Sequence, residues 1–144
     1  MAVYTNINKK DLSLINSKFE TYKFIRFKGI KQGIENTNYL LKTRNEKFIL
    51  TIFEKRVSKK EIPFFMKLMD QLDNLNFNCP KPLKNSKGNY MFKLKNKTAC
   101  IVSFLKGKDK KILNLKNCYN IGKMVATMHI STKKLNFIER IQWE

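Results

Sequence analysis

The chain has 144 residues, of which 42% are hydrophobic and 28% are charged. This balance is typical of a globular protein and excludes an intrinsically disordered one, and no apolar run approaches the roughly eighteen residues of a membrane-spanning helix. The net charge of +19 is compatible with a nucleic-acid or anionic-membrane partner, so its interpretation depends on which basic residues carry it.

Lysine accounts for 26 of the 30 basic residues, and asparagine (16) and isoleucine (14) are also abundant. These three types rise together in AT-rich coding sequences, whereas a protein that reads bases is expected to favour arginine, whose planar fork pairs with guanine edges. The lysines are also spread along the chain. We therefore expect no specific nucleic-acid partner and no membrane partner, although the positive field would attract phosphorylated ligands. A basic nucleic-acid-binding module is kept as an alternative.

The cysteines and the histidine argue against a structural zinc site. Cys79, Cys100 and Cys118 are far apart and form no CxxC pair, and His129 is the only histidine. Three reduced thiols are expected. The polar segment 1–10 lacks the apolar stretch of a secretory signal, which predicts a cytoplasmic protein.

A first helix is expected after Asn8. Asp11 stands three residues later as the partner of a capping box, and Leu12, Ile15 and Phe19 recur at helical spacing.

Three strands rich in branched and aromatic residues follow this helix. They are expected at residues 22–28, 39–43 and 47–53. Segment 29–38, between the first two, holds two glycines and two asparagines and is expected to form a loop with unusual backbone angles. A hairpin turn is expected at residues 44–46.

An apolar stripe predicts a second helix after the third strand. Its members are Phe64, Phe65, Leu68, Met69, Leu72 and Leu75. Two signals disagree on where this helix begins. Ser58 and Glu61 resemble a capping box, whereas Pro63 is best tolerated in a first turn and places the start about three residues later.

Two further strands and a last helix are expected downstream. The strands are expected at residues 89–94 and 98–104, with a turn at 85–88 before them and a linker at 106–108 after them. The helix is expected at about residues 115–129. Together the predicted elements indicate an α+β fold.

The last expected helix is apolar over much of its surface. Its apolar or small residues are Leu115, Cys118, Tyr119, Ile121, Gly122, Met124, Val125 and Met128. Such a helix needs packing partners on several sides. Only fifteen residues follow His129, so we expect the chain to be cut short or to pack against another molecule.

Several strings of the sequence carry a resemblance to a known family. They are residues 1–5, 27–30, 33–41 (GIENTNYLL), 48–57 (FILTIFEKRV), 63–65, 79–82 and 102–107. With the order of the elements, these strings make the chain resemble the small lobe of the protein-kinase-like fold. The closer resemblance is to the homoserine kinases of the aminoglycoside phosphotransferase-like superfamily, and it runs to about His129.

The resemblance implies a five-stranded antiparallel sheet with a helix after the third strand, plus the first helix of a truncated helical large lobe. Residues 1–103 would form a nucleotide-binding lobe, 104–114 a hinge, and 115–144 the start of the large lobe. The implied activity is transfer of the γ-phosphoryl group of ATP to the hydroxyl of homoserine, in threonine biosynthesis and with Mg²⁺. A related kinase with another hydroxylated substrate is the alternative.

The resemblance also implies that segment 29–38 folds over the phosphates of ATP. Gly29 and Gly33 would allow close backbone approach, and Asn36, Thr37 and Asn38 could donate hydrogen bonds to phosphate oxygens. From the residues alone, a polar hairpin loop is the alternative.

On the third strand, Thr51 stands where the family places a phosphate-binding lysine. Ile49, on the same face, would cover the adenine. Lys55 either supplies the missing charge or is a solvated lysine at the strand end. Glu61 is either the helix carboxylate that pairs with such a lysine or a capping-box residue.

Ser103, Phe104 and Leu105 lie where the hinge would bind the adenine edge, and they also suit the end of a buried strand. The family takes its base and metal ligands from a His-x-Asp motif and a later aspartate, and no aspartate follows His129, which is expected only to end its helix. We therefore expect no catalytic or metal-binding residue here and no turnover by this chain alone. An inactive fragment that regulates a partner through its last helix is a further alternative. The sequence does not predict the oligomeric state.

Overall fold

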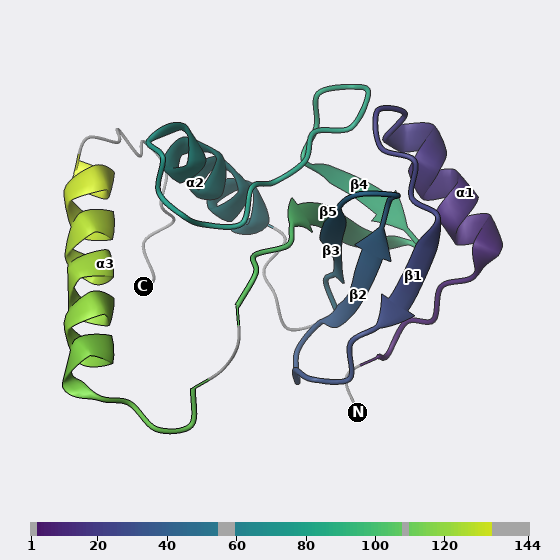
Figure 1. Cartoon of the computed structure of the whole chain (residues 1–144). Coiled ribbons are helices and arrows are strands. Elements are labelled where there is room, and N and C mark those ends of the chain that lie inside the picture. The colour runs from purple at the N-terminus through teal and green to yellow at the C-terminus, as the bar shows by residue number, and fades with distance from the viewer. Residues whose placement is uncertain (1–2, 55–59, 108–109, 134–144) are drawn as a thin grey trace.

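The computed structural model describes residues 3–54, 60–107 and 110–133. The elements within them, shown in Figure 1, are α1 (Lys9–Lys18), β1 (Arg26–Gly29), β2 (Thr37–Lys42), β3 (Lys47–Ile52), α2 (Ile62–Asn74), β4 (Met91–Leu94), β5 (Lys97–Ser103) and α3 (Leu115–Lys133). Their order is the one that the sequence predicts, and the α+β class is confirmed.

The five strands form one antiparallel sheet in the order β1-β2-β3-β5-β4. The helix α2 follows β3, as predicted. Neighbouring residues across antiparallel strands point to the same face of a sheet, and successive residues along a strand alternate between faces. The register therefore assigns every strand residue to one of two faces.

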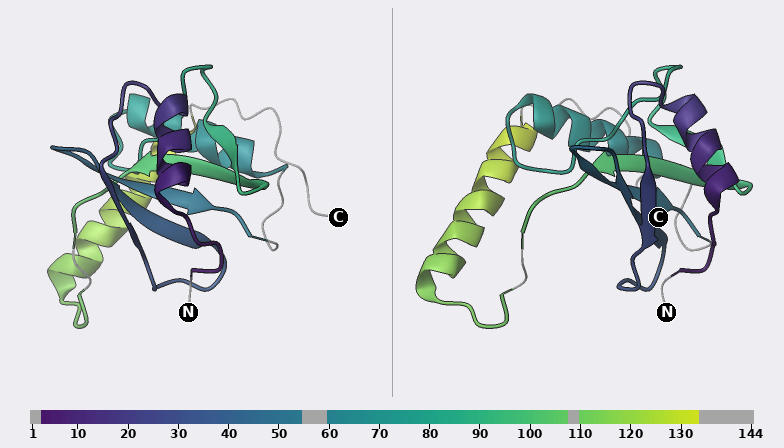
Figure 2. Two further views of the ribbon diagram at one scale, coloured as in Figure 1. Left: turned by 90° about the vertical axis from the view of Figure 1, so that its right-hand side faces the viewer. Right: turned by 45° about the vertical axis from the view of Figure 1, so that its right-hand side comes forward.

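One helix packs on each face, as Figures 1 and 2 show. The face toward α1, here called the α1 face, carries the larger core. That core joins Ile15 and Phe19 of α1 to buried strand residues, which are Tyr39, Leu41, Phe48, Leu50, Ile52, Phe92, Leu94, Ala99 and Ile101. The opposite α2 face carries a smaller cluster, in which Ile62 and Met66 of α2 pack with Cys100.

The start of α1 is the predicted capping box. The Asp11 N–H donates to Asn8 Oδ1 at 3.1 Å, and the Asn8 N–H donates to Asp11 Oδ2 at 2.8 Å. The first strand begins at Arg26 and not at residue 22. Before it, the Asn16 side chain exchanges two hydrogen bonds with the backbone of Phe24, so this stretch is held by α1.

Between the two predicted starts of α2, the structure follows Pro63. The helix begins at Ile62, with Pro63 in its first turn and Glu61 as the N-cap residue. The Glu61 side chain makes no capping hydrogen bond, and Ser58 lies outside the described residues. The capping box expected between these two residues therefore does not define the helix start.

The helix α3 stands apart from the sheet in Figure 1 and contacts α2. It runs to Lys133, four residues beyond its predicted end, and none of its residues is buried. Leu115 is 90% exposed and Tyr119 is 71% exposed. The described residues therefore leave the apolar surface predicted for this helix exposed to solvent. No helix among the described residues has the length and apolar character to cross a bilayer.

Candidate functional site

An apolar row on the α2 face lies nearest to the start of the hinge segment. Register places Lys28, Leu40, Ile49 and Val102 side by side across β1, β2, β3 and β5. Ile49 is half-buried, and Val102 packs against the α2 cluster. Ile49 thus contributes to an apolar surface on the α2 face, and the row ends in the exposed Lys28.

The next row on the same face is polar. Asn38, Thr51 and Cys100 are neighbours across β2, β3 and β5. The Thr51 hydroxyl donates to Asn38 Oδ1 at 2.8 Å, so the amide nitrogen of Asn38 remains as a donor on this face. Burial raises the pKa of the Cys100 thiol to about 12, which makes it an inert apolar neighbour at neutral pH.

The loop between β1 and β2 adds a set of backbone donors beside this polar row. The Ile30 N–H donates to the Asn38 carbonyl at 2.9 Å and closes the base of the loop. None of the N–H groups of residues 31–35 donates to another described residue, and Gly33 has φ of 112°. This left-handed region favours glycine, and consecutive free N–H groups in such a turn suit an anion.

Asn36 stands at the end of this loop. Its Oδ1 accepts from the Glu54 N–H at 3.3 Å, which leaves its amide nitrogen as a second side-chain donor near the loop.

One predicted phosphate-binding residue, Thr37, has its side chain on the α1 face, opposite the donors described above. Thr37 is fully buried on the α1 face, where its hydroxyl donates to Glu54 Oε1 at 2.8 Å and accepts from the Tyr4 N–H at 2.9 Å. The strand β2 begins at Thr37 and not at Tyr39, so strand alternation turns Thr37 away from the loop donors. The Thr37 side chain therefore lies on the face of the sheet opposite to that of a phosphate bound on the α2 face.

The structure shows a packing reason for glycine at position 29. A Cβ atom at this position would lie 3.1 Å from Val3 Cγ2. The glycine therefore makes room for the N-terminal segment on the α1 face, and its backbone φ is not in the left-handed region.

The three predicted hinge residues lie at the end of β5 and directly after it. The Ser103 N–H donates to the Lys81 carbonyl at 2.8 Å, and the Phe104 N–H donates to the Lys47 carbonyl at 3.1 Å. Leu105 has no backbone hydrogen bond to another described residue and is 41% exposed. Of the three predicted hinge residues, Leu105 is the one whose backbone N–H makes no hydrogen bond to another described residue.

A buried polar cluster near the loop was not predicted. It joins Thr5, Thr37, Glu54 and Lys97 on the α1 face. The sequence holds one indication of this cluster. Glu54 stands two residues after Ile52, and this spacing places a carboxylate on the same side as the apolar face of β3.

Lys55 lies outside the described residues, so its predicted role stays a prediction. Within residues 3–54, 60–107 and 110–133 there is no group of three or more histidine, cysteine, aspartate or glutamate side chains that could hold a metal ion.

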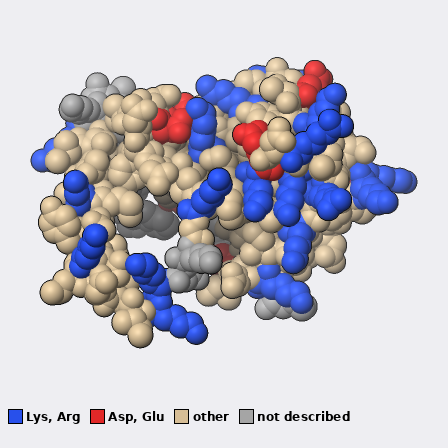
Figure 3. Space-filling view, in the orientation of Figure 1, with Lys and Arg blue, Asp and Glu red and all other residues tan. Residues whose placement is uncertain are grey.

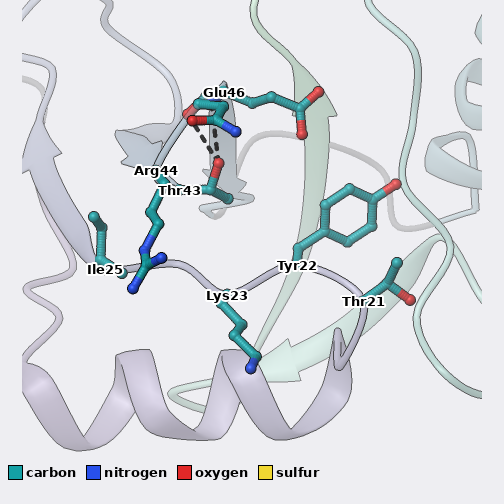
Figure 4. Close-up of a pocket in the computed structure, with 8 residues that line it drawn as sticks. Thr21, Tyr22, Lys23, Ile25, Thr43, Arg44 and Glu46 are labelled. Atoms are coloured by element: carbon teal, nitrogen blue, oxygen red, sulfur yellow. Dashed lines mark hydrogen bonds between the residues drawn. The ribbon is translucent and has the colours of Figure 1, made fainter.

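A pocket of about 460 Å³ lies at the other end of the sheet, between segment 21–25 and the β2–β3 turn. In Figure 4 the charged ends of Lys23, Arg44 and Glu46 point in different directions, and Thr43 is occupied by hydrogen bonds with Glu46. None of the predicted site residues lines it.

The basic side chains form no single stripe on the face seen in Figure 3. They occur over both the sheet and α3, and are densest on the side of the sheet and α1.

A model of the phosphotransferase enzyme family (APH) matches residues 26–139 of the chain. The homoserine kinase of Allorhizobium ampelinum is 40% identical over 133 residues, and that of Rhizobium rhizogenes is 36% identical over 149 residues. These matches cover 92% and 100% of this chain but 41% and 46% of the relatives. The chain thus spans less than half the length of these curated relatives.

Among solved structures, spectinomycin phosphotransferase in complex with ADP and spectinomycin matches with a TM-score of 0.69 and 11% sequence identity. The match covers 88% of this chain and 39% of that chain. At this identity the likeness shows the fold alone, and it confirms the predicted protein-kinase-like small lobe.

Proposed function

Because the chain belongs to the phosphotransferase enzyme family, we propose that it is the nucleotide-binding part of an ATP-dependent kinase. The observation that carries this proposal is the succession of three features along the sheet: the exposed Leu105 just after β5, the apolar row around Ile49 on the α2 face, and the row of Asn38 on the same face beside the free N–H groups of residues 31–35. A nucleotide has the same order of parts, from base edge to base plane to phosphates.

In this proposal the adenine lies against Ile49, Leu40 and Val102, and its edge bonds to the backbone of Leu105. The phosphates lie at the loop, where the N–H groups of residues 31–35 and the amide nitrogens of Asn36 and Asn38 donate to their oxygens. Lys28 and Lys55 are the candidate cations. Lys28 is on the α2 face by register, one row from Asn38.

We further propose homoserine as the acceptor, with transfer of the γ-phosphoryl group to its hydroxyl in threonine biosynthesis. The support is the similarity to relatives named homoserine kinase. Another small hydroxylated substrate is the second candidate. We place the transfer chemistry outside residues 1–144, so that this chain alone binds nucleotide without turnover, and we keep residues 1–103, 104–114 and 115–144 as lobe, hinge and start of a second lobe.

Calorimetric titration of the 144-residue chain with ADP tests nucleotide binding, and Asn38→Asp tests its location. An aspartate keeps the oxygen that accepts from Thr51 but replaces the amide donor with a negative charge near the phosphates. We expect ADP affinity to fall at least about tenfold. Asn45→Asp, in the exposed turn at the other end of the sheet, is the matched control and should bind like the wild type.

Equal affinities in the two variants would contradict the proposed location, and no binding by the wild type would contradict the proposed function. The acceptor is tested with a protein that spans the full length of the relatives. It should consume ATP when homoserine is added, and equal consumption with unrelated alcohols would overturn the substrate assignment.

A further inference from the structure

The N-terminal segment lies beside the β1–β2 loop. Figure 1 shows both at the lower edge of the sheet, and the two views of Figure 2 also show the loop near the chain's N-terminal end. The Tyr4 hydroxyl donates to the Ile34 carbonyl at 2.9 Å, at the tip of the loop. The backbone N–H groups of Tyr4 and Thr5 both donate to the Thr37 hydroxyl, at 2.9 and 3.1 Å, where the loop enters β2. This segment is therefore bonded to the loop at two points.

Glu54 connects this segment to the sheet. Its Oε1 accepts from the hydroxyls of Thr5 and Thr37, at 2.7 and 2.8 Å, and its Oε2 accepts from Lys97 Nζ in a short ion pair. Lys97 Nζ also donates to Thr5 Oγ1 at 2.7 Å, which closes a ring of hydrogen bonds. The Glu54 side chain is only 12% exposed, and hydrogen bonds to a charged group of this kind are stronger than neutral ones.

The same residue acts on the loop through its backbone. The Glu54 N–H donates to Asn36 Oδ1 at 3.3 Å. The side chain and the main chain of Glu54 therefore hold two consecutive residues, Thr37 at the start of β2 and Asn36 at the end of the loop. We call the group Tyr4, Thr5, Thr37, Glu54 and Lys97 the loop clasp.

We propose that the loop clasp positions the β1–β2 loop for the nucleotide, with Glu54 as its central positioning residue and Tyr4 as the contact to the loop tip. This inference rests on the proposed function. Its physical basis is preorganisation: residues 31–35 make no backbone N–H bond to other described residues, and an unrestrained loop would lose conformational freedom when it orders around a phosphate.

The position of the clasp supports a role in aligning the loop. It lies on the α1 face, opposite the donors of Asn38 and residues 31–35, so none of its side chains needs to touch the ligand. Removal of a clasp hydroxyl should weaken nucleotide binding through loop order, while the core around Phe19 and Leu50 stays intact.

Tyr4→Phe and Thr5→Val each remove one clasp hydroxyl in the 144-residue chain. Thr5→Ser is the conservative variant, which keeps a hydroxyl at position 5. We expect the dissociation constant for ADP to rise about three- to tenfold in Tyr4→Phe and Thr5→Val, and to return to the wild-type value in Thr5→Ser. Tyr119→Phe, on the exposed face of α3, is the matched control and should leave it unchanged.

Amide hydrogen exchange separates positioning from general stability. In the two weakened variants, exchange should accelerate at the hydrogen-bonded N–H groups that flank the loop, those of Ile30 and Glu54, and stay at wild-type rates in β3 and β5. ADP binding by the wild type together with wild-type affinity in Tyr4→Phe and Thr5→Val would overturn the inference, and so would faster exchange throughout the sheet. Absence of ADP binding by the wild type would instead contradict the proposed function itself.

Discussion

Glu54 carries a carboxyl whose pKa is set by its neighbours. Burial by itself would raise the pKa of this carboxyl, but hydrogen bonds from Lys97, Thr5 and Thr37 and the charge of Lys97 outweigh burial and hold the pKa below its ordinary value. A carboxyl with a depressed folded-state pKa stabilises the fold above its unfolded-state pKa, and this contribution is lost as the pH falls through the folded-state value.

We therefore predict an acid-sensitive contribution to stability from Glu54. The free energy of unfolding should fall as the pH is lowered from about 5 toward 3, and Glu54→Gln should be less stable than the wild type at pH 7 but lose less on acidification. Urea unfolding at several pH values measures this difference. Glu20→Gln, which changes an exposed residue, should follow the wild type; parallel pH curves for Glu54→Gln and the wild type would contradict the prediction.

At the same scale, sequence distance explains which contacts were predictable. Asn8 and Asp11 are three residues apart, so the capping box is visible in the sequence. Glu54 and Lys97 are 43 residues apart, and only the register of β3, β5 and their neighbours brings them together. Thr37 was predicted to bind phosphate as a loop residue, but it is the first residue of β2, and strand alternation places its side chain on the α1 face. Glycine-and-asparagine content does not show at which residue a loop ends.

At the scale of elements, the strands and helices follow from apolar spacing, while their boundaries depend on tertiary contacts. The hairpin of β2 and β3 was predictable because its turn and its alternation are local. The β1 start was not, because Asn16 of α1 takes the backbone groups of Phe24. Pro63 predicted the start of α2 correctly because its ring restricts the backbone whatever packs around it.

The helix α3 offers a test of backbone effects without packing effects. A Cβ atom on Gly122 would meet nothing within 4 Å, and the same holds for Gly88, but Gly88 has φ of +78°. Gly122→Ala should therefore stabilise α3 by about 0.5–1 kcal/mol, because glycine in a helix interior leaves more backbone freedom in the unfolded chain. Far-UV circular dichroism should show more helix, with slower amide exchange at residues 115–133.

Gly88→Ala is the matched control with the opposite expected sign. It places a side chain on a left-handed backbone at a cost of about 1 kcal/mol, measured as a lower free energy of unfolding. If both alanine variants shifted stability in the same direction, backbone conformation would not be the deciding factor at these two positions.

At the scale of the whole molecule, both apolar clusters are built from residues that precede Ser103. The larger cluster ends with Ile101 of β5, and the smaller one ends with Val102. The helix α3 buries none of its residues. Its apolar side chains therefore contribute little hydrophobic stabilisation within the described chain, since that stabilisation scales with the apolar area removed from water.

This division predicts that a chain ending at residue 107 keeps the fold of the sheet and its two helices. Its free energy of unfolding in urea should lie within about 1 kcal/mol of that of the 144-residue chain, because the described part of the removed segment, residues 110–133, supplies no core residue. Dispersed amide resonances would report the intact core. A chain ending at residue 94 is the contrasting variant: it lacks β5, which lies between β3 and β4 and supplies Ala99 and Ile101, and it should be unfolded. Collapse of the 107-residue chain would mean that the contact between α2 and α3 holds α2 on the sheet, so that α3 would have to be counted as part of the folding unit.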